Sequence, residues 1–311
     1  MKQLLRQLVN GEWLRHRAVG LTSAEQRPAR AMAATAVGER DVTGVLFPVS
    51  LYPLVIGLAR AADQPPSDLP ELRLRDQAGE LLGTIRLSPA GALDHSGGHV
   101  DLYCPWGSSV RCVPALYRAW RYVTAWRHMK VDAKRPGAFH MDFADIKALN
   151  VFYMMPRPVY LVTVVHGERS NLFPMDLVGP LGTNQFLLAL RTTSRSIETI
   201  LASERIVLSG APARCKELAY RLGGQHREGS IDWRALGVEL EPSPRFGFPI
   251  PADRLGVREL ELRHSQVVGS HRFFVTSIVH EEGPREEPQL CHVSEMYACW
   301  RAGQGRPFAD V

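Results

Sequence analysis

Apolar residues along this chain gather in short runs separated by polar turns, a pattern that predicts a mainly β protein. The clearest run, Val159–Val165, is continuous and rich in β-branched residues, so it predicts a strand buried on both faces. Gln185–Leu190 and Ile206–Ser209 predict two further strands. Between the first two strands, residues 166–171 form a predicted turn, and residues 172–183, which carry Pro and Gly, form a predicted loop.

Two hairpins follow from the same pattern. Glu71–Arg75 alternates apolar and charged residues, a turn follows, and Leu81–Leu87 returns as the partner strand. Near the C-terminus, Val257–Val267 and Arg272–Val279 are related in the same way around Gly269. The hairpins indicate antiparallel sheets.

Two segments of the first hundred residues carry weaker signals. Thr22–Arg40, rich in Ala, Arg and Ser, is predicted to be a mobile link or a weak helix. Ser88–Gly98 is predicted to be a loop. His95 and His99 flank its glycines, and although a metal pair is conceivable there, an exposed glycine loop is the simpler interpretation. No metal site is predicted.

Helices are predicted in several segments, two of which have clear helical spacing. Met1–Arg17 predicts an amphipathic basic helix that packs on its own domain or on a partner, with contact to a membrane surface as the alternative. Asp142–Leu149 predicts a short helix. Cys112–Met129 interleaves Trp and Arg, which could stack on nucleic acid, but a core-facing apolar stripe is the commoner arrangement. The residues of that stripe are Val113, Leu116, Trp120 and Val123.

These elements divide the chain into three predicted parts. Residues 1–110 form an N-terminal β-rich domain in which no known motif is found. Residues 111–138 form a linking amphipathic helix that ends at a boundary around Pro136-Gly137. Residues 139–311 form the C-terminal domain.

Composition and charge restrict the partners. Of 311 residues, 45% are hydrophobic and 22% charged, which is ordinary for one large domain or two. The net charge of +5 comes from arginines spread along the chain, so it favours an anionic small molecule over nucleic acid. Five widely spaced cysteines indicate reduced thiols. Charged residues interrupt the N-terminus, and prolines interrupt the uncharged run 43–59, so the sequence predicts a soluble cytoplasmic protein with no membrane partner.

The strongest chemical signal is the segment that follows the strand Gln185–Leu190. It places four hydroxyls and two guanidiniums within six residues at a predicted helix N-terminus, namely Arg191, Thr192, Thr193, Ser194, Arg195 and Ser196. Unpaired N–H groups, the positive end of the helix dipole, hydroxyls and arginines together suit a phosphate group. A Ser/Thr-capped helix with surface arginines is the alternative.

The order of elements around this segment resembles the flavin reductase-like proteins of the FMN-binding split-barrel fold. The matching features are Ser170-Asn171, Pro174, the strand through Leu190, Thr193-Ser194-x-Ser196, Ile200 and Gly269-Ser270-His271. The resemblance covers roughly residues 141–300. Ser270 stands where the family usually has Asp, and Arg191 where many members have Asn.

The resemblance implies a fold, a cofactor and a set of site residues. The fold is an antiparallel FMN-binding split β-barrel, here preceded by the extra β-rich N-terminal domain, in a homodimer with the flavin near the subunit interface. Thr193, Ser194 and Ser196, with Arg191 or Arg195, would hold the phosphate. His271 would lie at the nicotinamide side. The residues implied for the flavin ring are Ser170, Asn171 and the backbone of Phe173, Pro174 and Met175.

Three functions remain open at this point. The leading one is an FMN-dependent oxidoreductase in which NADH or NADPH reduces the flavin, which then reduces a small-molecule acceptor or leaves as free reduced flavin. The second is a flavin-dependent tailoring enzyme acting on an organic substrate, which Ser270 and the long N-terminal addition favour. The third is a non-catalytic protein that binds a flavin, nucleic acid or another partner. His226 and Arg227 could meet a substrate, although a solvated loop is the simpler expectation.

Overall fold

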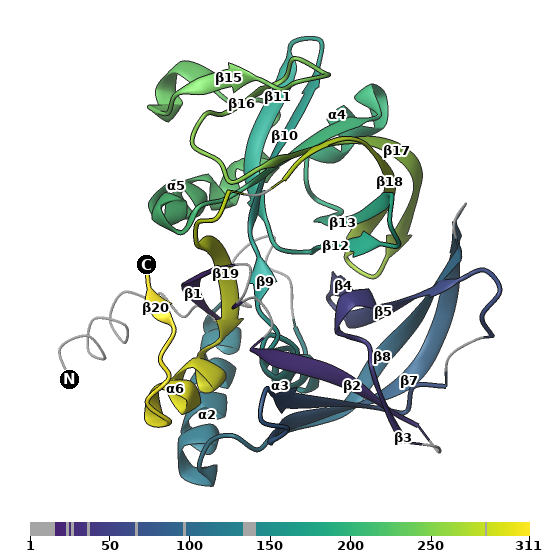
Figure 1. Ribbon diagram of the computed structural model, residues 1–311, viewed down its shortest axis with the longest axis vertical. Coiled ribbons are helices and arrows are strands. Elements are labelled where there is room, and N and C mark those ends of the chain that lie inside the picture. Colours follow the sequence, from purple (N-terminus) through teal and green to yellow (C-terminus); the bar gives the residue numbers. More distant parts are fainter. Residues whose placement is uncertain are drawn as a thin grey trace.

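The chain folds around two seven-stranded antiparallel sheets, one above the other in Figure 1. The computed structural model describes residues 16–22, 25, 28–35, 38–65, 68–95, 98–132, 141–283 and 285–311. Most of the predicted helix Met1–Arg17 and the predicted boundary at Pro136-Gly137 lie outside these residues. The mainly β, antiparallel fold class with an extra β-rich N-terminal region is confirmed.

The N-terminal sheet has the strand order β3-β2-β6-β7-β8-β5-β4. Its strands are β2 (Ala29–Thr35), β3 (Gly38–Asp41), β4 (Leu46–Leu51), β5 (Leu54–Ala61), β6 (Glu71–Asp76), β7 (Leu81–His95) and β8 (Gly98–Val110). The predicted hairpin is confirmed, with Arg73 opposite Thr84.

Two predictions for this sheet were wrong. The predicted link or weak helix Thr22–Arg40 contains β2 and most of β3. In β2 the small apolar residues Ala29, Ala31 and Ala33 alternate with exposed or half-buried ones and face the core. The predicted loop Ser88–Gly98 is largely the second half of β7, which pairs with β8 from Gly83 to His95. Long-range pairing overrides the weak strand propensity of both segments.

The C-terminal sheet has the order β11-β10-β14-β17-β18-β13-β12. Its strands are β10 (Tyr160–His166), β11 (Arg169–Met175), β12 (Val178–Leu181), β13 (Gln185–Arg191), β14 (Arg205–Gly210), β17 (Val257–Val268) and β18 (His271–Glu282). The predicted strands at β10, β13, β14, β17 and β18 are confirmed.

The predicted loop 172–183 was wrong, because it contains most of β11 and all of β12. Both strands lie at the edges of the sheet, where one side of each strand needs no N–H donor. Pro174 and Pro180 are therefore compatible with strand structure there. The predicted turn 166–171 is likewise shorter, because β11 begins at Arg169.

Two small sheets complete the β structure. β1 (His16–Leu21), β9 (Arg157–Pro158), β19 (Gln289–Ser294) and β20 (Ala309–Asp310) form one, in which β1 pairs with β19. β15 (Leu240–Pro242) and β16 (Pro249–Pro251) form the other. The first of these sheets joins the start of the described chain to its end (Figure 1).

The α-helices of the described residues lie outside the sheets, and the longest of them has 18 residues. They are α2 (Ala115–Asp132), α3 (Phe143–Phe152), α4 (Ser196–Ser203), α5 (Lys216–Arg221) and α6 (Glu295–Gly303). None of the helices in the described part has the combination of length and apolarity that a membrane crossing requires. α3 packs on the N-terminal sheet, since Ile146 and Leu149 share a core with Leu72 and Leu74. The predicted domain boundaries remain predictions.

The core-facing stripe predicted for the linking helix was wrong. Val113, just before α2, is buried as predicted, but Leu116 is 87% exposed, and Trp120 and Val123 are also exposed. α2 instead packs against the core through Tyr117 and Tyr122. The helix therefore contacts the core through its tyrosines and leaves Leu116, Trp120 and Val123 on its exposed side.

Candidate functional site

The segment with the predicted phosphate residues is a tight turn between β13 and α4. Ser194 N–H donates to Arg191 O at 2.8 Å, and α4 begins at Ser196. Thr193 and Arg195 are exposed and Arg191 is half-buried, so these three can reach a ligand. Ser194 and Ser196 are buried.

The buried hydroxyls of this turn are bonded to a neighbouring loop. Ser194 Oγ donates to His226 O at 2.9 Å. Asn171 Nδ2, on β11, donates to Ser196 Oγ at 3.1 Å and to Gln225 O at 2.9 Å. Asn171 therefore ties β11, the α4 turn and the loop 222–230 together. The structure brings these predicted site residues into one place, although it turns Ser194 and Ser196 toward protein.

The predicted ring-holding strand lies beside the same loop. Phe173 is buried and its ring centroid is 6.4 Å from that of His226, while Met175 is buried and Pro174 half-buried. Ser170 Oγ accepts a hydrogen bond from Trp233 Nε1 at 2.7 Å. The hydroxyl oxygen of Ser170 is thus already hydrogen-bonded within the protein.

His226 carries the one feature of this loop that points to a ligand. Its Nε2 is buried and has no hydrogen-bond partner among the residues that the structure describes. Burial, and then the charges of Arg191 and Arg227, lower the pKa of His226 to about 4, so the ring is neutral at pH 7. A neutral imidazole nitrogen beside Phe173 can hydrogen-bond the polar edge of a flat ring. The residues here therefore fit a flavin.

The predicted nicotinamide-side residue, His271, is covered by the N-terminal sheet. Only 1% of its surface is exposed. Its Nδ1 lies 2.9 Å from Ser270 Oγ and accepts from Leu51 N–H at 3.4 Å, so in the neutral ring the proton is on Nε2. The ring of Tyr52 stacks on His271 at a centroid distance of 6.3 Å.

Tyr52 also contacts the phosphate-side arginine. The guanidinium of Arg191 lies 5.4 Å from the centre of the Tyr52 ring, and Arg191 Nη2 donates to Tyr52 Oη at 3.4 Å. Tyr52 belongs to the turn between β4 and β5. Sequence reasoning missed it, because no motif in the first hundred residues marks this turn.

His271 makes stability depend on pH. Burial, followed by the charges of Arg191 and His226, lowers its pKa from 6.5 to about 3. Between pH 6.5 and 3 the unfolded chain therefore binds a proton at His271 that the folded chain does not bind. The contribution of neutral His271 to the free energy of unfolding is complete above pH 6.5 and falls as the pH drops toward 3. Between pH 7 and 5, the free energy of unfolding should fall by about 2 kcal/mol less in His271→Asn than in the wild type.

Urea unfolding at a series of pH values measures this difference. His264→Asn, an exposed histidine on β17, is the control and should keep the wild-type slope. Equal slopes for His271→Asn and the wild type would show that His271 is not held neutral.

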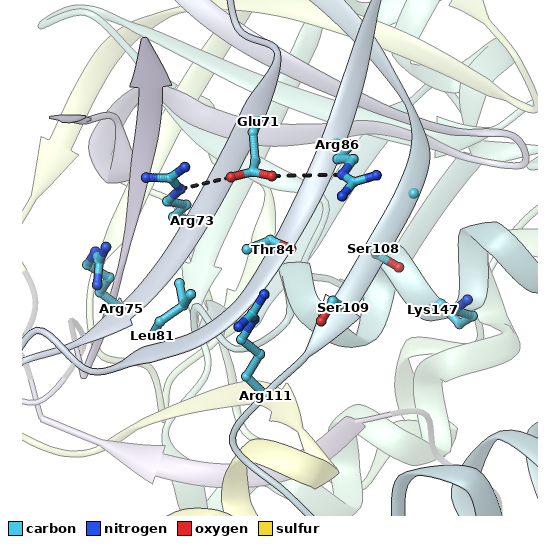
Figure 2. Close-up of a pocket in the computed structure, with 11 residues that line it drawn as sticks. Glu71, Arg73, Arg75, Leu81, Thr84, Arg86, Ser108, Ser109, Arg111 and Lys147 are labelled. Carbon is cyan, nitrogen blue, oxygen red and sulfur yellow. Dashed lines mark hydrogen bonds and ion pairs between the residues drawn. The ribbon is translucent and has the colours of Figure 1, made fainter. Parts of the chain in front are cut away.

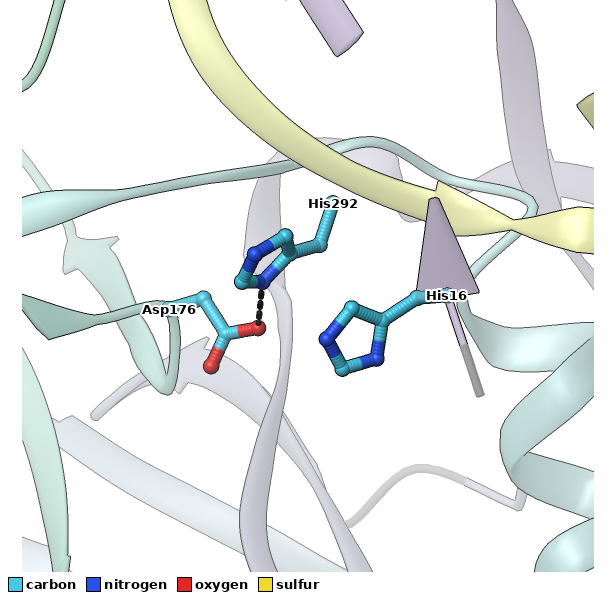
Figure 3. A group of neighbouring side chains, drawn as sticks. All are labelled: His16, Asp176 and His292. Carbon is cyan, nitrogen blue, oxygen red and sulfur yellow. Dashed lines mark hydrogen bonds and ion pairs between the residues drawn. The ribbon is translucent and has the colours of Figure 1, made fainter. Parts of the chain in front are cut away.

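A second polar group lies just past the ring-holding strand. Asp176 accepts hydrogen bonds from His292 Nδ1 at 2.8 Å and from Tyr153 Oη at 3.0 Å, and His16 lies beside them (Figure 3). One ligand atom each from His16, Asp176 and His292 lie within 4.8 Å of one another, a grouping that could hold a metal ion. The sequence predicted no metal site, and the three residues come from distant parts of the chain.

A basic basin of about 400 Å³ lies on the outer face of the N-terminal sheet (Figure 2). Glu71 bridges Arg73 and Arg86 at its rim. Arg111 and Lys147 complete the positive lining. The basin is formed by β6, β7, β8 and α3, and none of the predicted flavin-site residues line it.

Comparison with known protein families finds a match in the C-terminal half. Residues 152–301 match the family model described as the flavin reductase like domain. No curated protein matches the chain.

Among solved structures, the NADH:FAD oxidoreductase SgcE6 of Streptomyces globisporus is similar, with 15% identity, 48% of this chain and 88% of that chain covered, and a TM-score of 0.43. A structure described as that of a flavin reductase from Haemophilus somnus has 14% identity, with 47% of this chain and 93% of that chain covered, and a TM-score of 0.41. An FMN-binding protein from Thermus thermophilus has 22% identity, covers 45% and 83%, and has a TM-score of 0.38.

Proposed function

We propose that the protein is an FMN-binding oxidoreductase in which NADH or NADPH reduces the flavin for a second, small-molecule acceptor, because residues 152–301 match the flavin reductase like domain. The family match is the observation that carries the proposal. The buried, unpartnered Nε2 of His226 beside Phe173 supports it, because it offers a polar contact to a flat ring at the predicted place.

The residues of this chain have separate tasks in the proposal. Arg191, Thr193 and Arg195 bind the phosphate, since they are the accessible members of the turn before α4. Phe173 and His226 bind the ring, and Asn171 holds the turn and the loop together. FMN, when bound, supplies the hydride-accepting chemistry, so the protein needs only to orient the reactants and exclude water.

Anaerobic absorption spectroscopy tests this function. Purified protein is mixed with FMN, and the visible band is followed as NADH or NADPH is added. We expect the band to bleach at a rate that free FMN does not show. A protein that gains no colour with FMN would overturn the proposal and favour a non-catalytic role.

A second candidate is the tailoring enzyme, and one observation favours it. His271 is buried under Tyr52, and Ser270 is bonded to Ser50 and Tyr52, so the predicted nicotinamide side is closed within the chain. For this candidate the bound flavin stays yellow with both nicotinamides. Organic substrates would then be screened against the dithionite-reduced protein.

A further inference from the structure

The two large sheets have the same topology. If the strands of each sheet are numbered 1 to 7 along the chain, β2–β8 for the first and β10, β11, β12, β13, β14, β17 and β18 for the second, both orders read 2-1-5-6-7-4-3. Every neighbouring pair in both sheets is antiparallel. β2 thus corresponds to β10, β4 to β12, β5 to β13 and β8 to β18. Seven strands can be ordered in many ways, so an identical order indicates one architectural unit used twice.

The two units pack through corresponding strands. One buried apolar cluster joins them, and its members from the first sheet lie mainly on β4, β5 and β8, while those from the second lie on β12, β13 and β18. The Phe47 and Phe273 rings are stacked across this seam with centroids 6.2 Å apart. Use of the same surface on both units is the rule for a twofold pair of subunits. Here the two units belong to one chain (Figure 1).

The turns at the ends of the seam make reciprocal contacts. The turn between β17 and β18 meets the turn between β4 and β5, where Ser270 N–H donates to Tyr52 O at 2.9 Å. At the corresponding place in the other direction, His95, the last residue of β7, has a side-chain hydrogen bond with Gln185, the first residue of β13. The contact is therefore approximately symmetric.

Two glycines, Gly57 and Gly269, leave room for the side chains and turns that meet at this seam. A Cβ on Gly57 of β5 would lie 2.6 Å from Phe47 and 2.9 Å from Val100. Gly269 has a φ of +55°, and a Cβ there would lie 2.6 Å from Ser50 Oγ. Glycine at both positions allows the strands and turns to come together.

The two units differ in their polar groups. At the end of the β13–β18 ladder Arg191 faces His271, whereas at the matching end of the β5–β8 ladder Ala61 faces Gly98. The connection from β13 to β14 contains α4, whereas no helix occurs in the described residues between β5 and β6. At this corresponding position of the described chain, therefore, only the C-terminal unit has the charged and polar groups of an anion site.

We propose that residues 29–110 are a second split-barrel repeat that completes the flavin site within the same chain, with Tyr52 as a flavin-binding residue. The inference rests on the proposed function, because it assigns the wall of that same site. Tyr52 is placed for this role by its contacts with both Arg191 and His271. The expected stoichiometry is one FMN per chain of 34.7 kDa. The predicted homodimer stays a prediction, and the site does not need it.

Flavin binding by Tyr52 variants tests the residue. We expect Tyr52→Ala to bind FMN about tenfold more weakly than the wild type, because the ring over Arg191 is lost. Tyr52→Phe keeps the ring and should bind nearly as well as the wild type. Trp106→Ala is the matched control, because the Arg86 guanidinium lies 5.2 Å from the centre of the Trp106 ring on the outer face of the same sheet. This variant should bind FMN with the affinity of the wild type. Thermal unfolding of each variant identifies a loss of fold.

A mixing experiment tests whether the site is completed within one chain. Tyr52→Ala and Arg191→Glu chains carry different tags, are co-expressed and are assayed together at an FMN concentration near the wild-type Kd. We expect the mixture to bind no more FMN than the average of the two variants. A mixture that recovers binding, or a folded Tyr52→Ala chain that binds FMN as well as the wild type, would overturn the inference alone. A wild-type chain that binds no FMN would overturn the proposed function as well.

Discussion

Reversing the charges of Arg191 and Arg195 together is expected to abolish FMN retention. Each guanidinium can form a charge-assisted hydrogen bond with the phosphate, worth about 1.5–3 kcal/mol. Replacing both by Glu removes these bonds and adds repulsion at the N-terminus of α4. The expected loss in affinity is therefore more than about 100-fold. Isothermal titration with FMN and the flavin content of the purified protein measure it.

Two comparisons make this result specific. Arg86→Glu with Arg111→Glu changes the net charge by the same amount on the outer face of the N-terminal sheet and should leave FMN binding unchanged. Riboflavin lacks the phosphate, so its affinity should be similar in the wild type and in the Arg191/Arg195 variant. If FMN retention survives the double reversal, the phosphate is not held at this turn.

The strands were predictable where the local pattern and the tertiary structure agree. The continuous run at β10 and the alternating run at β6 are buried as their residue types require. The same reasoning failed for β2, whose small residues Ala31 and Ala33 give a weak apolar signal. It also failed for β11 and β12, since their prolines are tolerated only because these strands are edges. Edge position follows from strand order, which no local pattern contains.

The site was predictable only on the side that carries the motif. Asn171 and the turn before α4 were identified, and the structure brings them together. Tyr52 was not identified, because its role depends on the packing of one seven-stranded sheet on another. The repeat itself was also missed. The repeat shows in the order in which distant strands pair, and the sequence does not give that order. The polar pair Arg191 and His271 of one unit also corresponds to Ala61 and Gly98 in the other, so no shared motif marks the two units.

The repeat offers a physical reason for the long N-terminal addition. A seven-stranded sheet whose apolar face includes Leu187, Phe273 and Val275 needs a cover for that face. In this chain the cover is β4, β5 and β8 of the first unit. Because the cover is covalently attached, it can specialise. Ala61 and Gly98 stand in the cover where the second unit has Arg191 and His271, and Tyr52 of the cover contacts the site of the second unit.

Removing the carboxylate of Asp176 is expected to be the most destabilising single change where the four-stranded sheet, which contains β1 and β19, meets the end of β11. Its side chain is 17% exposed and pairs with His292, and Tyr153 also donates to it. Asp176→Ala leaves the half-buried His292, the buried Tyr153 and the neighbouring Arg157 without their anion, at a cost of about 3–5 kcal/mol in unfolding free energy. Glu198→Ala is the control, because the exposed Glu198–Arg169 pair should contribute less than about 1 kcal/mol.

The pH dependence of Asp176 gives this prediction a second, independent measurement. Burial opposes its ionisation, but the hydrogen bond from His292 and the charges of His292, His16 and Arg157 outweigh burial and hold the pKa well below the usual 3.8. The stability from this pair is therefore present above about pH 4 and is lost as the pH falls through the lowered pKa. Asp176→Asn cannot titrate, so urea unfolding between pH 5 and 2 should show a shallower acid slope than the wild type. An unchanged slope, together with an Asp176→Ala variant as stable as the wild type, would show that Asp176 is a solvated carboxylate and that the cluster in Figure 3 is not a buried ion pair.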